Sequence, residues 1–460
     1  MAGASESGEH VGRNGREVRD SLLLKNTRSQ ALTLATGELM NSGSAASLEM
    51  PFPVLMEAGD GPFLIDADGN RYIDFQIGFG SMLLGHRHPL VQSALLDQAA
   101  NRGWQFGLHN PNQVKLADQL IKGDNCAERV IFCNSGTEST MYAIRVARAF
   151  SGKPKLGVFD GFYHGAHDYG IGAADPNSPR DAPVYQPIGA GVLPAIVENQ
   201  IMLPYRSDAA FELIRQHKDD LAMVMIEGVQ SSNPHEKHEL TAYLQELKTV
   251  CAESDVLFMM DEVITGFRLA YGGAQEYFDV QPDLATYGKV LGGGLPIGAV
   301  GGRADIMKLF NSMAMGDKKG IMSGGTFSGN PLTMAAGVAQ TSFLDENRAE
   351  IYPRLNSMGQ RLAETINQYA REQGMGVQVL NAGSMFQIYF NEGEIWSARD
   401  TGGMRSQAET DFYLHLLDNG VLIPGTRRSF ISHVHTPELV DEAAEIIKKS
   451  LNLVRQDDLF

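Results

Sequence analysis

The chain has 460 residues, of which 43% are hydrophobic, 20% are charged and 8% are aromatic. These values are typical of a soluble globular protein, and the length leaves room for two or three domains. A formal net charge of −17 argues against nucleic acid or an anionic membrane as the main partner, because both bind basic surfaces.

The N-terminal residues 1–30 are polar, carry both charge signs and show no clear period, which predicts a mobile arm. They contain no apolar stretch of signal-peptide length, and no later run is long enough to cross a bilayer, so we expect a cytoplasmic protein. A helix is predicted over residues 29–39, and a hairpin over residues 63–75. Pro89 can open a helix that runs to about residue 102.

Within residues 86–330, helical and strand patterns alternate from about residue 110 onward. The predicted strands are apolar on both faces, which is typical of a buried, mainly parallel sheet covered by helices. They span residues 129–133, 156–159, 200–203, 222–226, 256–260 and 284–287. We therefore expect an α/β fold with a large domain at 86–330.

After residue 330 the pattern changes to that of a smaller α+β domain, residues 331–460. A long helical stretch is expected to bend or break near Pro353, followed by short strands around 376–390 and 420–434 with a helix at 405–418 between them. The last helix begins at Thr436-Pro437, where threonine can cap and proline suits the first turn. Residues 31–85 are expected to complete this domain.

Two charged residues follow apolar strands of the large domain. Asp261 ends one strand, and Lys289 follows another and opens a run of glycines. Open α/β sheets bind ligands at the carboxyl ends of their strands, where the two side chains can meet. A pyridine aldehyde needs such a pair, because lysine forms a Schiff base with it and an acid keeps the ring nitrogen protonated. The alternative is an ordinary strand-end carboxylate and a solvated lysine, and these two residues alone do not decide between them.

A phosphate site is predicted at the helix that follows Cys133-Asn-Ser-Gly-Thr-Glu138. Ser135 and Glu138 have capping-box spacing, Gly136 allows close backbone approach, and free N–H groups at a helix N-terminus bind anions. Capping boxes also open many helices that bind nothing. Thr326, in the glycine-rich stretch 324–331, is a second phosphate contact, although a plain loop would explain the same glycines.

The loop 160–167 holds an aromatic residue and two histidines between glycines. Tyr163 or His164 could cover one face of a flat ring. Metal ligation is the alternative for the histidines, but no carboxylate or cysteine stands at a matching helical spacing. The cysteines, Cys126, Cys133 and Cys251, show no paired spacing, so we expect a reducing compartment, no disulfide framework and no metal site.

Five motifs in register resemble those of the class III aminotransferases, which are pyridoxal-phosphate enzymes of fold type I. The resemblance runs from about residue 50 to the last helix and is strongest to the glutamate-1-semialdehyde aminomutases and the β-amino-acid transaminases. The motifs are Asn134-Ser-Gly-Thr-Glu138, Gly161-Phe-Tyr-His-Gly165, Asp261-Glu-Val-Ile-Thr-Gly-Phe-Arg268, Gly288-Lys-Val-Leu-Gly-Gly-Gly-Leu-Pro-Ile-Gly298 and Gly325-Thr-Phe-Ser-Gly-Asn-Pro331.

The resemblance implies pyridoxal 5'-phosphate as the cofactor, with Lys289 as its Schiff-base lysine and proton carrier. Asp261 would pair with the pyridine nitrogen, Tyr163 would stack on one face of the ring, and Val263 would lie under the other. Further cofactor contacts are expected from Ser135, Gly136, Thr137, His164 and Glu227.

Two other features follow from the resemblance. Thr326 would reach the phosphate of the neighbouring subunit, which implies a homodimer with shared active sites. Glu227 stands where the family usually has Glu-Pro-Val, and Gly228 replaces the proline. The contact to the ring hydroxyl would come from Ser232 or Asn233, and the resemblance does not choose between them.

Departures from the family bear on the substrate. The aminomutases, and many β-amino-acid transaminases, carry a carboxylate-binding arginine before the first hairpin, and residues 41–53 contain none. Ser44 cannot replace a bidentate arginine. Phe79 stands in place of an aminomutase tryptophan, and Arg428 stands near an aminomutase glutamate. Arg428 or Arg427 would hold an acid from another direction, or the amine substrate has no carboxylate near its nitrogen; alternatively, both arginines are surface residues.

The sequence therefore predicts an aminotransferase that moves an amino group between an amine or amino-acid donor and a keto-acid or aldehyde acceptor. The alternatives are a 2,1-aminomutase or an amine lyase with the same cofactor, and, less favoured, a protein of this fold without catalysis. The expected partners are small-molecule substrates and a second copy of the chain, without nucleic acid or membrane.

Overall fold

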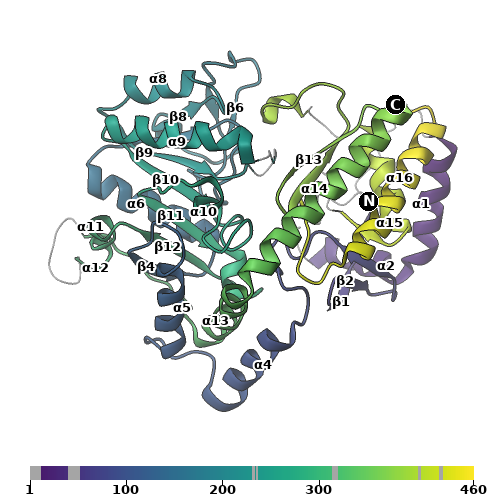
Figure 1. The fold of residues 1–460 in the computed structure, drawn as a ribbon, viewed down its shortest axis with the longest axis horizontal. Coiled ribbons are helices and arrows are strands. Elements are labelled where there is room, and N and C mark those ends of the chain that lie inside the picture. The colour runs from purple at the N-terminus through teal and green to yellow at the C-terminus, as the bar shows by residue number, and fades with distance from the viewer. Residues whose placement is uncertain are drawn as a thin grey trace.

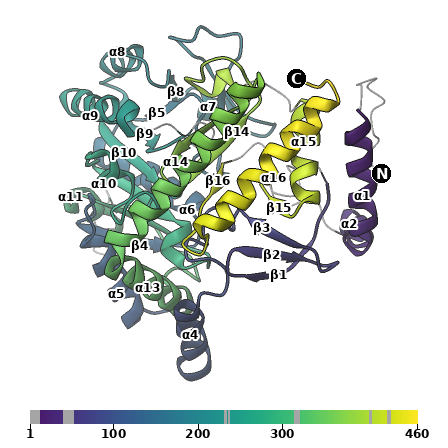
Figure 2. The same ribbon diagram turned by 45° about the vertical axis from the view of Figure 1, so that its right-hand side comes forward.

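The structure is a computed structural model that describes residues 12–39, 52–230, 234, 237–312, 320–401, 406–423 and 428–460. It has a large half, built on one seven-stranded sheet, and a small half with two smaller sheets. The two halves lie side by side, and the long helix α14 runs along the small half at their junction (Figure 1). Figure 2 shows the same arrangement with the small half turned forward.

The seven-stranded sheet has the order β4-β12-β11-β10-β9-β5-β8. All neighbouring strands are parallel except β12, which is antiparallel to both β11 and β4. This arrangement confirms the predicted α/β fold with a mainly parallel sheet. The strands are β4 (Arg129–Cys133), β5 (Lys155–Phe159), β8 (Gln200–Leu203), β9 (Leu221–Glu227), β10 (Leu257–Glu262), β11 (Leu284–Gly288) and β12 (Gly298–Gly302).

Both faces of this sheet are buried, because alternate residues of each strand enter different hydrophobic cores. On β9, Met223 and Met225 face α6, whereas Val224 and Ile226 face α9. Each group is fully or almost fully buried. The other helices and short strands of the large half are α4 (Pro89–Asp97), η1 (Gln98–Arg102), α5 (Pro111–Ile121), α6 (Gly136–Ser151), β6 (Ala173–Ala174), β7 (Tyr185–Gln186), α7 (Pro194–Val197), α8 (Ala209–Gln216), α9 (Lys237–Glu253), α10 (Ala274–Phe278), η2 (Lys289–Gly292), α11 (Ala304–Met307) and α12 (Leu309–Ser312).

The small half joins segments from both ends of the chain. The predicted hairpin pairs β2 with β3, and β15 adds to it in parallel, which gives the order β1-β2-β3-β15. A second sheet has the order β13-β14-β16. The elements are β1 (Met56–Asp60), β2 (Phe63–Asp66), β3 (Arg71–Asp74), α14 (Arg348–Gln373), β13 (Gln378–Ala382), β14 (Met385–Tyr389), η4 (Ala398–Asp400), α15 (Gln407–Asp418), β15 (Val421–Leu422), β16 (Ser429–Phe430) and α16 (Pro437–Gln456).

Helix α13 (Pro331–Glu346) connects the halves and packs on α4, α5 and η2. The chain leaves helical geometry at Asn347, not at Pro353, which lies inside α14. The helical stretch is therefore broken, but at Asn347, earlier in the chain than the expected position near Pro353. Asn347 has a φ of −117°, and its side-chain amide donates to the carbonyl of Phe343, so this residue ends α13.

The N-terminal segment differs from the expected mobile arm over the described residues 12–30. Helix α1 (Arg13–Lys25) packs on α15 and α16, and α2 (Thr27–Leu39) follows it. Val18 and Leu22 are buried, and the Asp457 carboxylate accepts the backbone N–H groups of Asn14 and Gly15. A short apolar stripe and a distant acid thus fix a segment whose composition is mostly polar. Among the helices described, none has the length and apolar character needed to cross a membrane.

Candidate active site

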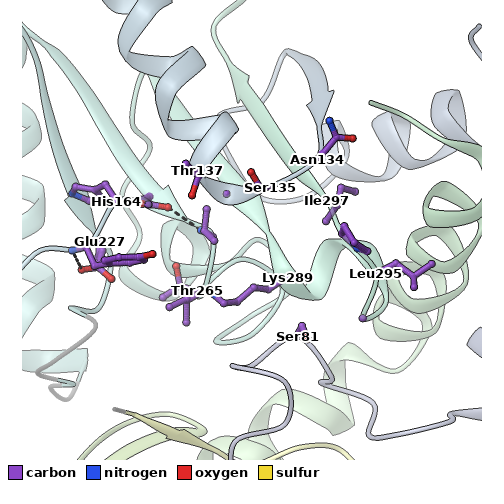
Figure 3. Close-up of a pocket in the computed structure, with 18 of the residues that line it drawn as sticks. Ser81, Asn134, Ser135, Thr137, His164, Glu227, Thr265, Lys289, Leu295 and Ile297 are labelled. Carbon is purple, nitrogen blue, oxygen red and sulfur yellow. Dashed lines mark hydrogen bonds and ion pairs between the residues drawn. The ribbon is translucent and has the colours of Figure 1, made fainter. Parts of the chain in front are cut away.

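A cavity of about 430 Å³ lies at the carboxyl ends of the central strands, where four of the five predicted motifs meet. Figure 3 shows Lys289 extending toward its middle, between the start of α6, with Ser135 and Thr137, and the loop that carries Ser81. The described residues that line it include Ser81, Asn134, Ser135, Gly136, Thr137, Tyr163, His164, Glu227, Val229, Asp261, Val263, Ile264, Thr265, Lys289, Leu295, Pro296 and Ile297.

Lys289 follows β11 directly and has a φ of +43°, a backbone conformation that lysine rarely adopts. Such strain persists where the surrounding structure enforces it, and it often marks a functional site. Burial lowers the pKa of the Lys289 amine to about 8, and the nearby Arg428 cation adds to this effect, while Asp261 and Glu227 oppose it. About a tenth of the amine is therefore neutral, and so nucleophilic, at pH 7, which is far more than for a lysine of ordinary pKa.

Asp261 is held in one orientation by hydrogen bonds to both of its oxygens. Its Oδ1 accepts from the Thr286 hydroxyl at 2.9 Å and from the Val263 N–H at 3.1 Å. Its Oδ2 lies 2.8 Å from His164 Nδ1. Asp261 and Thr286 are direct neighbours in the β10–β11 register, so the sheet itself positions the acid. His164 Nε2 is buried and has no hydrogen-bond partner in the described part of the chain.

The start of α6 carries the cap that the sequence predicts, and we call its first turn the anion cradle because its geometry suits an anion. Ser135 Oγ accepts from the N–H of Glu138 at 3.1 Å, and the Glu138 carboxylate accepts from the N–H of Asn134 at 2.8 Å. These caps leave the first N–H groups of the helix, at Gly136 and Thr137, directed to the cavity.

Glycines bring this helix terminus close to the sheet. A Cβ at Gly136 would lie 2.7 Å from Val263 Cγ1, and a Cβ at Gly298 would lie 2.1 Å from the Ser135 carbonyl oxygen. Any larger residue would push α6 away from the strand ends. The helix terminus, the fixed acid and the amine can therefore contact one small ligand.

Tyr163 and Glu227 lie together at one end of the cavity. The Tyr163 N–H donates to Glu227 Oε2 at 3.2 Å, and the Tyr163 side chain is 45% exposed. Glu227 is buried at the end of β9. Gly228 follows it, and a Cβ there would lie 2.4 Å from Ala274 Cβ. The replacement of the family's proline by Gly228 therefore matches the tight packing of α10 against this turn.

Arg428 is buried, so its interpretation as a surface residue is wrong. Its guanidinium Nη1 lies 3.7 Å from Glu227 Oε1, and the two side chains are 7% and 6% exposed. Arg427, Ser232, Asn233 and the segment 41–51 lie outside the described residues.

Three predicted site residues are not among the described residues that line this cavity. Arg428 is one of them, and its contact is with Glu227, which does line the cavity. Phe79 is partly buried in a run of left-handed residues, and Ser81 lines the cavity beside it. Thr326 lines a separate hollow of about 730 Å³, together with Gln105 and Phe132. Four further lining residues were given no role from the sequence: Ser81, Val229, Ile264 and Thr265. Ile264 and Thr265 lie within the motif Asp261–Arg268, whereas Ser81 and Val229 only follow Phe79 and Glu227 closely in the chain.

The two histidines of the loop 160–167 make separate contacts. His164 pairs with Asp261, and His167 Nε2 lies 3.0 Å from the Thr140 hydroxyl. Over the described ranges there is no group of three or more His, Cys, Asp or Glu side chains placed to hold a metal ion. The donors of the cavity instead fit a ring that carries both an aldehyde and a phosphate: an amine, a fixed acid and a helix N-terminus.

Comparison with known proteins gives consistent matches over nearly the whole chain. A family described as "Aminotransferase class-III" matches residues 44–451. The chain is 37% identical over 413 residues to a protein named glutamate-1-semialdehyde 2,1-aminomutase from Methanocaldococcus jannaschii, which covers 86% of this chain and 91% of that one.

Solved structures agree with this match. An omega-transaminase from Sphaerobacter thermophilus is similar with a TM-score of 0.84 at 30% identity, over 93% of this chain and 98% of that one. A structure described as a transaminase with PLP bound is similar with a TM-score of 0.81 at 28% identity, over 94% of this chain and 99% of that one. The resemblance inferred from the five motifs is confirmed.

Proposed function

The chain belongs to the class III aminotransferases, whose cofactor is pyridoxal phosphate, and from this premise we propose that it is an aminotransferase. It would move an amino group between an amine or amino-acid donor and a keto-acid or aldehyde acceptor. The observation that carries this proposal is the buried Arg428 guanidinium, which lies beside Glu227 and influences the Lys289 amine. A cation at this place can hold the carboxylate of an acidic partner.

Bound pyridoxal phosphate supplies an aldehyde for the substrate amine and a ring that withdraws electrons from the substrate carbon. The N–H groups of Gly136 and Thr137 and the Ser135 cap would hold its phosphate. Asp261 would hold the proton on the ring nitrogen, because an anion favours the protonated form of a neighbouring base. Val263 and Tyr163 would contact the two faces of the ring.

Lys289 has two tasks in this proposal. Its neutral amine attaches the cofactor, and once released it moves the proton of the 1,3-shift. Both tasks need a neutral amine near neutral pH, which agrees with the lowered pKa. The fixed position of Lys289 at the end of β11 would keep Nζ near the reacting carbon of a bound substrate.

The Arg428–Glu227 pair allows one cavity to accept two kinds of substrate. A neutral amine can bind while the pair stays intact. An acidic partner can take the guanidinium with its own carboxylate, because the 3.7 Å separation leaves Arg428 and Glu227 in an ion pair rather than in a close bidentate contact.

A homodimer with shared sites is part of the proposal. Thr326 lies in a hollow outside the cavity of its own chain, and large apolar residues that line this hollow or adjoin its lining residues in the chain are exposed. Trp104, Leu108 and Phe327 are 64%, 80% and 61% exposed. Large exposed apolar patches often mark protein interfaces. A second copy that covers this face would place Thr326 next to a partner's cavity.

An aminomutase is the second candidate. The observation that favours it is the 37% identity to a protein named glutamate-1-semialdehyde 2,1-aminomutase. Arg428 argues against it, because the resemblance places a glutamate near this position in the aminomutases. The absence of an arginine from residues 41–53 also argues against it.

The purified holoenzyme, offered a panel of amines, distinguishes these functions. For an aminotransferase we expect conversion of the cofactor to its amine form, and recovery of the aldehyde form when a keto acid is added. Release of ammonia would indicate a lyase. Rapid conversion of glutamate-1-semialdehyde to 5-aminolevulinate without a second substrate would indicate an aminomutase and overturn the proposal.

A further inference from the structure

A turn of the small half lies against the loop of the large half that carries Tyr163 and His164. The turn is η4 with the residues before it, and it is the short yellow-green coil near the top of Figure 1, between the two halves. A Cβ at Gly161 would lie 2.6 Å from Ala398 Cβ, so the turn and the loop are in close contact.

Arg399 makes the central contacts of this junction. Its Nε donates to Asp160 Oδ2 at 2.5 Å, and the two side chains are only 13% and 10% exposed. Its Nη1 and Nη2 donate to the carbonyl and the hydroxyl of Ser178, at 2.8 Å and 3.1 Å. One guanidinium therefore joins two separate segments of the large half, which a lysine could not do with the same geometry.

The turn itself is held rigid from within the small half. Asp400 and Ser397 form a complete capping box, and the Asp400 carboxylate also accepts from the Trp396 N–H at 3.1 Å. A second ion pair, from Arg180 to Asp400 at 2.6 Å, lies at the edge of the junction, where the Arg180 side chain is 65% exposed. Arg399 thus extends from a fixed support, while Arg180 reaches the same turn with a side chain that is largely exposed.

Asp160 begins the loop whose next residues face the cavity. Three residues after it, the Tyr163 N–H binds Glu227, and one residue further His164 binds Asp261. The Asp160 carbonyl also accepts from the buried Gln230 side chain at 2.6 Å. A displacement of Asp160 would therefore move Tyr163 and His164 relative to the strand ends that carry Glu227 and Asp261.

We propose that Arg399 is a positioning residue for the reaction: through Asp160, it sets the place of Tyr163 and His164 over the cofactor ring. This inference rests on the proposed function, because it assumes that these two residues face the cofactor. Without Arg399, the Asp160 carboxylate would be left without its cation in a largely buried place, and the loop would shift to hydrate it. The small half would then no longer fix the positions of the side chains that face the ring.

The test compares Arg399→Met with Arg399→Lys and with the matched control Arg180→Met, all as holoenzymes. For Arg399→Met we expect kcat to fall about tenfold to a hundredfold, because small displacements of positioning groups have effects of this size. The KM values should change less than kcat. The visible circular dichroism of the bound cofactor should change, since it reports the surroundings and tilt of the ring. Arg399→Lys should restore part of kcat, and Arg180→Met should stay within about twofold of the wild type.

Asp160→Asn gives a second route to the same result, because it removes the charge and keeps the shape. Its loss should not add to that of Arg399→Met in the double variant. Unchanged kcat and circular dichroism in Arg399→Met, at normal cofactor content, would overturn the inference. A loss of kcat that only parallels a fall in unfolding temperature, and that Arg399→Lys does not restore, would also overturn it. If the wild type bound no pyridoxal phosphate at all, the proposed function would fail instead.

Discussion

Two loops framed by glycines contact the N-terminal half of α6. They differ in whether their side chains find binding partners within the same chain. The loop 160–165 lies within the cavity, and both Tyr163 and His164 bind carboxylates at the strand ends. The loop 324–330 lies outside it, where Phe327 is 61% exposed and Thr326 faces an open hollow. The loop 160–165 makes its contacts within one chain. The loop 324–330 is exposed and has the features of a surface that binds another molecule. Changes in the inner site and at the outer loop should therefore behave differently.

The largest effect is expected at the centre of the inner site. Lys289→Ala removes both the amine that attaches the cofactor and the proton carrier, so turnover should fall by roughly 10⁴-fold or more. Peptide mapping after borohydride reduction should place the cofactor on Lys289 in the wild type. The exposed Lys308→Ala serves as control and should keep full activity. A label on any other lysine would contradict the assignment.

Asp261→Asn should leave the cofactor attached but slow proton abstraction. The neutral amide no longer favours the charged ring nitrogen, so we expect a loss of about 10²- to 10⁴-fold in single-turnover rate. Asp305→Asn, in an exposed pair with Arg303, is the matched control. A near-normal rate in Asp261→Asn would mean that the acid of the inner site has been misidentified.

Arg428→Ala tests whether Arg428 binds the carboxylate of an acidic substrate in the inner site. A charge-assisted contact contributes about 1.5–3 kcal/mol, so KM for a keto-acid partner should rise roughly tenfold to a hundredfold. A neutral amine should be nearly unaffected, because it does not need the guanidinium. The control is Arg348→Ala, whose side chain is 50% exposed. Equal losses on both substrates would show that Arg428 is structural.

The outer loop is tested by mixing two inactive variants. Thr326→Asp places a negative charge where we propose that a partner's phosphate binds, which should weaken cofactor binding. Refolded or co-expressed with Lys289→Ala, it should form hybrid dimers with one intact site, and random pairing should restore roughly a quarter of wild-type activity. Mass measurement at assay concentration accompanies the test. A fully active monomer would contradict the proposal that the loop 324–330 completes the site of a second chain.

The smallest effect is a shift of pH dependence. Only the neutral amine of Lys289 attacks the aldehyde, so cofactor attachment to the apoprotein should be fast above the lysine pKa and slow below it. Because burial lowers that pKa to about 8, the midpoint should lie near pH 8 rather than near 10.5. Stopped-flow absorbance between pH 6 and 10 would measure it. A midpoint above pH 10 would mean that the cavity leaves the amine fully hydrated.

The sequence predicted the parts of the molecule that have local signals. The six apolar strands and the cap of α6 are of this kind, and the structure contains them. Strand β12 was missed because Gly298-Ala-Val-Gly-Gly302 has few residues with strand preference. It is a strand because it pairs on both sides, with β11 and β4.

Contacts between distant segments could not be predicted from local patterns. Helix α1 is fixed by Asp457, and Arg428 pairs with Glu227, although each pair is far apart in the chain. The resemblance indicated that Arg428 is unusual but not whether it is buried. Nothing in the sequence indicated that Arg399 reaches Asp160, because Arg399 belongs to no motif and the loop 160–167 was considered only for its aromatic residue and histidines.

The close approach of β12 to the start of α6 has a consequence for how this protein can change. At Gly136 and Gly298 no side chain fits without displacing the helix terminus, so saturation mutagenesis should recover almost only glycine at these two positions. The opposite wall, where Figure 3 shows Ser81, has no such restriction from the anion cradle. Selection for new substrates can therefore act on that wall while the cofactor-holding part stays constant.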